Sequence, residues 1–157
     1  MRRELRQINC SCVRIHASGE FYSAEYVNKW AAIAEQASSV TFFAYTRSWN
    51  NDKPGLLDAL FRFSQLPNVF LWFSCDSHTG EPPDFPGIRR AFMMLSDSDV
   101  PNWPVDLFFR VSKKTVRKKI GSTLVCPAEN GVTETTCGKC KLCSSYNTVT
   151  LQRATSP

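Results

Sequence analysis

Four cysteines in the last third of the chain have the spacing of a metal or iron–sulfur site. They are Cys126, Cys137, Cys140 and Cys143. The last three form two successive C-x2-C steps, which put three thiolates on one short loop, and the distant Cys126 is followed by Pro127. Such a run, together with a more distant cysteine before proline, is typical of the ligands of a [4Fe–4S] cluster. The sequence therefore predicts that these four cysteines bind an iron–sulfur cluster.

Zinc is the alternative occupant of this site. Structural zinc sites usually take two C-x2–4-C pairs from separate knuckles, and the overlapping triplet fits that arrangement less well. The chain has seven cysteines and no secretory signal, so metal binding is favoured over disulfides. The other cysteines are most simply interpreted as small apolar fillers: Cys10 and Cys12 near the first predicted strand, and Cys75 at the end of the third.

Polar side chains follow three of the predicted strands at the point where each strand ends. They are His16, Ser18 and Glu20 after the first strand, Thr46, Arg47 and Ser48 after the second, and Cys75 and Asp76 after the third. Parallel strands end at the same edge of a sheet, where ligands commonly bind, so these residues are predicted to line one ligand cleft. The simpler alternative is that Ser18-Gly19 forms a turn and Glu20 supports the following helix. No nucleophile–base pair or phosphate-binding glycine loop is evident, so the residues define no reaction.

The elements that position these groups alternate along the chain. Apolar, β-branched and aromatic runs predict strands at Val13–His16, Val40–Tyr45, Val69–Phe73, Ala91–Leu95 and Val105–Arg110. Helical spacing of apolar residues predicts helices at Ser23–Ala37, with Ser23 as N-cap, and at Pro54–Leu66. The first three strands lie about 28 residues apart, which is the length of one strand–helix unit.

This pattern predicts an α/β fold with a mainly parallel sheet, similar to part of a β/α barrel. The α/β domain is expected to comprise residues 1–120. A cysteine-rich segment that holds the metal is expected at residues 121–146, and a tail at 147–157.

A dense run of positive charge lies between the last strand and the cysteines. Its basic residues are Lys113, Lys114, Arg117, Lys118 and Lys119. Such a run could contact the phosphates of nucleic acid, although it is more often a solvated surface. The net charge of +5 is a weak indication of an anionic partner. A zinc-stabilised module that binds nucleic acid or a partner protein is therefore the alternative function.

No apolar run approaches the ~20 residues that a membrane span requires, and no secretory signal is present. We therefore expect a cytoplasmic protein that does not interact with a membrane.

Three ordered motifs resemble those of the phage "gene product 88" family. The first is Val13–Ser23 followed by Tyr26-Val27 and Trp30, the second is Phe42–Ser48, and the third is the cysteine-rich end. The resemblance implies a protein of phages or other mobile elements, acting in the host cytoplasm, with uncharacterised activity and a fold related to partial β/α barrels. It extends more remotely to radical S-adenosylmethionine proteins.

The chain departs from the family pattern in two ways. It has Glu20 where family members usually carry Asp, and the N-terminal segment with further cysteines that longer relatives have is absent. It also contains no C-x3-C-x2-C motif of radical enzymes. Motifs and resemblance together predict a phage iron–sulfur protein of unknown activity.

Overall fold

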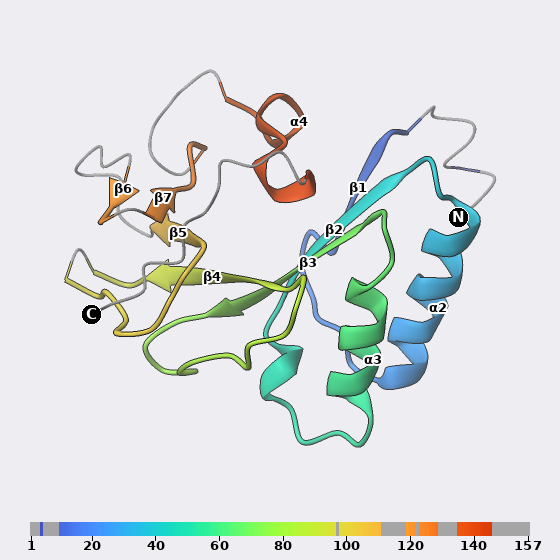
Figure 1. Cartoon of the computed structure of the whole chain (residues 1–157), viewed down its shortest axis with the longest axis horizontal. Coiled ribbons are helices and arrows are strands. Elements are labelled where there is room, and N and C mark those ends of the chain that lie inside the picture. The colour runs from blue at the N-terminus through green and yellow to red at the C-terminus, as the bar shows by residue number, and fades with distance from the viewer. Residues whose placement is uncertain are drawn as a thin grey trace. The chain divides into compact units, whose positions relative to one another are not determined.

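One mixed sheet forms the centre of the fold. The computed structural model describes residues 4, 10–96, 98–110, 119–121, 123–128 and 135–145. Within these residues, the strands are hydrogen-bonded in the order β1-β2-β3-β4-β5-β7-β6 (Figure 1). Their bounds are β1 Cys12–Ile15, β2 Thr41–Thr46, β3 Val69–Cys75, β4 Arg89–Met94, β5 Leu107–Arg110, β6 Lys119–Ile120 and β7 Thr123–Val125. The first six strands in this order run parallel and β6 is antiparallel to β7, which confirms the predicted α/β class.

All five predicted strands are present, with ends that differ by a few residues. Their apolar runs are long enough to identify them, and β3 is buried at every position from Val69 to Phe73. The short hairpin of β6 and β7 was not predicted. β7 has only three residues, too few to produce a recognisable alternation, and it is held in place by pairing with β5 through Leu107 and Phe108.

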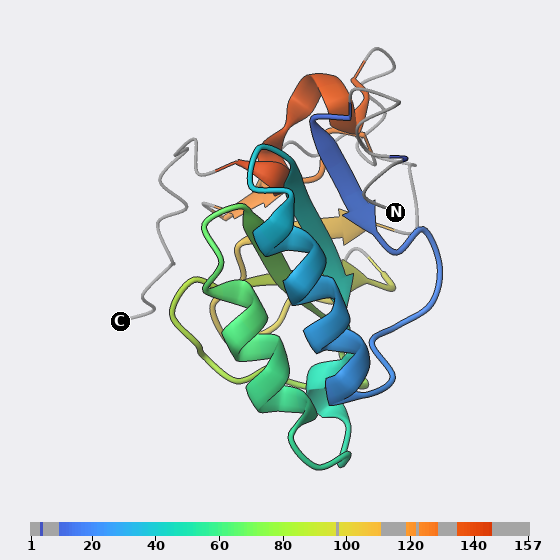
Figure 2. The ribbon, with the colours of Figure 1, turned by 90° about the vertical axis from the view of Figure 1, so that its right-hand side faces the viewer.

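Two helices of the N-terminal part lie side by side, as Figures 1 and 2 both show. They are α2 (Ala24–Gln36) and α3 (Leu56–Ser64). The predicted N-cap Ser23 accepts a hydrogen bond from the backbone N–H of Tyr26. The helix predicted from Pro54 begins two residues later, at Leu56, because Gly55 adopts a left-handed conformation with φ of 70°. No helix in the described part of the chain is long and apolar enough to cross a membrane.

By its internal contacts the chain forms two compact units. The N-terminal unit comprises Met1–Trp72 and Pro83–Ile88, and the C-terminal unit comprises Phe73–Pro82 and Arg89–Pro157. The predicted cysteine-rich segment 121–146 belongs to the C-terminal unit, and its separation from the α/β domain stays a prediction.

Asn68 joins the end of α2 to the sheet. Its side-chain amide donates to the carbonyl oxygens of Ala34, Ala37 and Val40, at 3.0, 3.2 and 2.9 Å. The carbonyl groups at the end of a helix lack full intrahelical pairing, and this amide adds a donor to those of Ala34 and Ala37 as well as to that of Val40. The carbonyl oxygen of Asn68 also accepts from the N–H of Phe42 on β2, at 2.8 Å.

Replacing this amide should therefore weaken the fold. We expect Asn68→Ala to lower the free energy of unfolding by about 1–3 kcal/mol, measured by chemical denaturation, because three carbonyl groups lose a donor. The control is Asn28→Ala, at an exposed position of α2, which should change stability by less than about 0.5 kcal/mol. Equal stabilities of the two variants would contradict this role.

Candidate functional site

The carboxylate of Glu20 joins the loops that follow β1 and β2. Its Oε2 accepts from the hydroxyls of Thr46, at 2.5 Å, and Ser48, at 3.1 Å. Its Oε1 accepts from the backbone N–H of Arg47, at 3.0 Å. Four of the residues predicted to line a cleft are thus brought together inside the N-terminal unit, although they are 26 to 28 positions apart in sequence.

Local backbone geometry explains how these groups meet. Gly19 has φ of +98°, a conformation that residues with a side chain rarely adopt, and it turns the chain just before Glu20. On the other side, β2 ends at Thr46, and the 3-10 helix η1 (Ser48–Asn50) follows. The Thr46 hydroxyl oxygen accepts from the N–H of Ser48, at 3.0 Å, so one hydroxyl links this helix to Glu20. Ser18 is exposed in the same turn as Gly19.

His16 lies in an aromatic environment at the end of β1. Its Nε2 is 2.9 Å from the phenol oxygen of Tyr26, and its ring meets those of Phe21 and Trp30 edge-on, with centroids 5.0 and 6.4 Å away. Among the described residues, its buried Nδ1 has no hydrogen-bond partner. Burial lowers the pKa of this imidazole, and the nearby carboxylate of Glu20 opposes that shift. The histidine is therefore favoured in its neutral form, which could accept or relay a proton.

Cys75 and Asp76 belong to the C-terminal unit and are engaged within it. The Cys75 thiol is fully buried and lies 3.5 Å from the carbonyl oxygen of Ala91. Oδ1 of Asp76 accepts from the N–H groups of His78, at 3.0 Å, and Thr79, at 2.9 Å, and so stabilises the turn that follows β3. Whether these two residues share a cleft with Glu20 stays a prediction.

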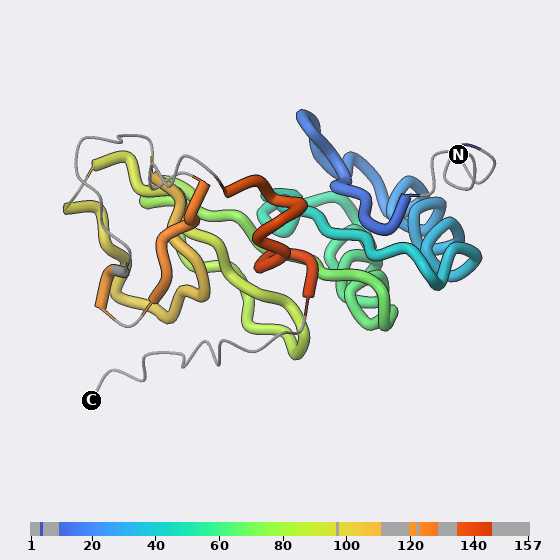
Figure 3. Tube along the Cα trace, turned by 90° about the horizontal axis from the view of Figure 1, so that it is seen from above, coloured from blue at the N-terminus to red at the C-terminus, as the bar shows by residue number. Residues whose placement is uncertain are grey.

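Three of the predicted metal ligands lie on one short helical segment. Cys137 and Cys140 begin and end the single turn α4 (Cys137–Cys140), and Cys143 lies in the 3-10 helix η2 (Leu142–Ser144). Thr136 caps α4 by accepting from the N–H of Lys139. Lys141 adopts a left-handed conformation, with φ of 54°, between the two turns. Figure 3 shows residues 135–145 as one compact red coil.

The fourth predicted ligand, Cys126, is buried and directly follows β7, where its N–H donates to the carbonyl of Phe108 at 2.8 Å. All seven cysteines lie in the described part of the chain, and none forms a disulfide. Among the described residues, no three cysteine, histidine or acidic side chains are close enough to hold one metal ion. Four cysteine thiols are nevertheless suitable donors for a thiolate-bound metal. Their sulfur atoms would have to draw together to bind it.

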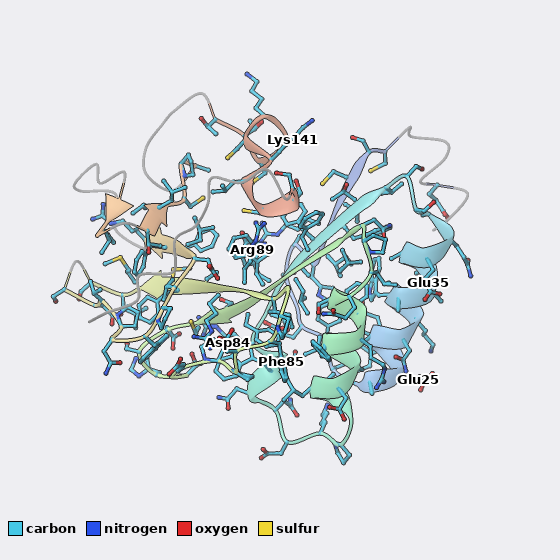
Figure 4. The ribbon with its side chains drawn as sticks, in the orientation of Figure 1. Glu25, Glu35, Asp84, Phe85, Arg89 and Lys141 are labelled. Atoms are coloured by element: carbon cyan, nitrogen blue, oxygen red, sulfur yellow. The ribbon has the colours of Figure 1, made fainter. Side chains whose placement is uncertain are left out.

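Sequence reasoning missed Arg89, the first residue of β4. Its guanidinium donates to the carbonyl oxygen of Leu142, at 3.3 Å, and to that of Ser145, at 3.1 Å. In Figure 4 its side chain points toward the coil that carries Lys141. A single arginine at the start of a strand carries no sequence signal for a contact more than 50 residues away.

The remaining predicted residues lie apart from these groups. Lys113, Lys114, Arg117 and Lys118 fall outside the described residues, and Lys119 begins β6. A cavity of about 190 Å³ in the C-terminal unit is lined by residues 100–105, Phe108, Ile120, Gly121 and Thr123. None of its lining residues is among the predicted site residues.

The hydrogen bond between Glu20 and Thr46 should be measurable by a double-mutant cycle. We expect Glu20→Gln and Thr46→Val each to destabilise the protein, and the double variant to lose less than the sum. Their interaction free energy should be about 0.5–3 kcal/mol, because both single changes remove the same bond. Chemical denaturation of the four proteins measures it. Additive effects would show that the carboxylate and the hydroxyl do not interact.

The lowered pKa of His16 predicts a pH dependence of stability. The unfolded chain binds a proton at this residue near the ordinary value of about 6.5, whereas the folded protein binds it only at lower pH. The stability that His16 contributes is therefore fully present above the ordinary pKa of about 6.5 and is lost as the pH falls below it. Between about pH 7 and pH 5, the free energy of unfolding should fall less in His16→Gln than in wild type. His78→Gln, which changes an exposed histidine, should behave as wild type, and a slope in His16→Gln equal to that of wild type would contradict the assignment.

Comparison with known proteins places the chain in a family. The sequence model of a family described as Gene product 88 matches residues 1–146. The Gene 88 protein of Mycobacterium phage L5 is 29% identical over 137 residues, which cover 83% of this chain and 49% of that protein. The Gene 88 protein of Mycobacterium phage D29 is 39% identical over 64 residues, which cover 40% of this chain and 24% of that protein. The chain thus spans at most about half the length of these curated relatives, and no solved structure is significantly similar to it. Because the family match covers most of its length, the chain belongs to the Gene product 88 family of phage proteins.

Proposed function

We propose that this phage protein binds a [4Fe–4S] cluster through Cys126, Cys137, Cys140 and Cys143. The observation that carries the proposal is the placement of three thiols on one segment of two helical turns, α4 and η2. Thiolates at this spacing, completed by a more distant cysteine before a proline, are the usual ligands of such a cluster. The cluster, when bound, supplies an iron centre that can exchange electrons.

The charges around the cysteines are compatible with this role. Four thiolates around a cluster core of charge 2+ leave a net charge of −2, which nearby cations would partly neutralise. Lys139 and Lys141 are exposed neighbours of the cysteines in sequence, and the guanidinium of Arg89 is hydrogen-bonded to the same segment.

The residues joined by Glu20 form the second part of the proposal. In parallel α/β folds, ligands bind at the ends of the strands, where loops present polar groups above a rigid sheet. The loops after β1 and β2 present a fixed carboxylate near a half-buried histidine whose pKa is lowered by burial. We propose that these loops bind a polar ligand, with Glu20 accepting hydrogen bonds from it and His16 available to move a proton.

A zinc-stabilised module that binds nucleic acid or a partner protein remains the second candidate. It uses the same cysteines, and its phosphate contacts would come from the basic run that begins at Lys113. The two candidate functions predict different metals and different colours of the protein, so metal analysis of one preparation distinguishes them.

The test is metal analysis of the whole chain purified without oxygen. The cluster predicts a brown protein with about four iron and four sulfide ions per chain. Cys140→Ser should lose most of this iron and become less stable, since metal binding and folding are coupled in such sites. Cys12→Ser, at an exposed cysteine of β1 outside the proposed site, should keep both.

A colourless protein containing one zinc ion would overturn the cluster and favour the second candidate. Retention of iron by Cys140→Ser would instead show that the ligand set is wrong.

A further inference from the structure

Arg89 clamps the backbone on both sides of Cys143. Its Nη1 donates to the carbonyl oxygen of Leu142 and its Nη2 to that of Ser145, at 3.3 and 3.1 Å. These two carbonyls bracket the cysteine in sequence. The two nitrogens belong to one rigid planar group, so both bonds together fix the orientation of the segment as well as its position.

We propose that Arg89 is a positioning residue of the metal site, holding the backbone on both sides of Cys143 beside β4 so that this ligand is in place when the other cysteines draw together to bind metal. The inference rests on the proposed function, because it concerns the same four cysteines. It assigns a role to a residue that is remote from them in sequence and is not itself a ligand.

The strand supplies the rigidity that such a clamp requires. Arg89 begins β4, which pairs in parallel with β5 from Ala91 onward. Successive side chains of a strand point to opposite faces. The next residue, Arg90, is buried, and its guanidinium bonds Glu81 at 2.9 Å while its N–H bonds Asp106 at 2.7 Å. The backbone at Arg89 is thereby held next to an anchored residue.

The segment that Arg89 holds is short. η2 is a single 3-10 turn, and a helix end leaves carbonyl groups without partners inside the helix. An arginine that donates to such carbonyls satisfies them and adds a positive charge beside the cysteine. Residues that orient metal ligands in this way typically change metal affinity by about 10–100-fold when they are removed.

Cobalt(II) provides a probe that does not depend on which metal the protein carries in the cell. The full-length chain, freed of metal and with its thiols reduced, is titrated with Co²⁺ without oxygen, and thiolate-to-cobalt absorbance reports binding through sulfur. We expect Arg89→Met to bind Co²⁺ about 10–100-fold more weakly than wild type. Arg89→Lys keeps the charge but loses the two-pronged geometry, so its affinity should be intermediate. The matched control is Arg62→Met, at an exposed arginine of α3, which should bind as wild type does.

The outcomes separate this inference from the function on which it rests. A wild-type chain without thiolate-to-cobalt absorbance would overturn the metal site itself. Wild-type affinity in Arg89→Met would overturn the positioning role alone and leave the metal site standing. Full recovery in Arg89→Lys would also contradict it, because charge by itself would then suffice. If Arg89→Met does not fold, as judged by circular dichroism, the comparison of Arg89→Lys with wild type decides between the same two results.

Discussion

Burial of both faces of β3 is the constraint on which the rest of the structure depends. Every residue from Val69 to Phe73 is buried, and Trp72 and Phe73 have no exposed surface. Burial of a large apolar side chain stabilises a fold by about 1.5–3 kcal/mol, so this strand is a major contribution. Parallel sheets occur almost only where both faces are covered. The sheet order places β3 between β2 and β4.

Polar side chains gather where β1 and β2 end. At the ends of β1 and β2 these groups satisfy one another, with a carboxylate accepting three hydrogen bonds from the opposite loop. The same bonds hold the loops in a fixed relation and leave an acidic group at the edge of the sheet. Glu20 is therefore a structural link between the two loops, and burial lowers the pKa of the nearby His16.

The cysteine segment is organised by different means. Thr136 caps its first turn, a left-handed Lys141 divides the two turns, and Arg89 ties the end to the sheet. Each of these is a hydrogen bond or a backbone conformation, since the segment contains too few apolar residues to form a core. In segments with so few apolar residues, metal coordination commonly supplies the missing stabilisation, and the metal site that we propose would do so here.

By itself the sequence determined the parallel α/β class, five strands, two helices with the Ser23 cap, and the family, because apolar periodicity and motifs are properties of neighbouring residues. It also indicated that Glu20 and Thr46 lie at strand ends. Only the tertiary structure decided that their side chains meet, that Asp76 stabilises its own turn, and that Arg89 reaches the residues around Cys143. The pairing of β7 with β5 was likewise decided there. Apart from the turn of Asp76, these contacts join residues distant in the chain, and the geometry that brings them together arises only when the sheet forms.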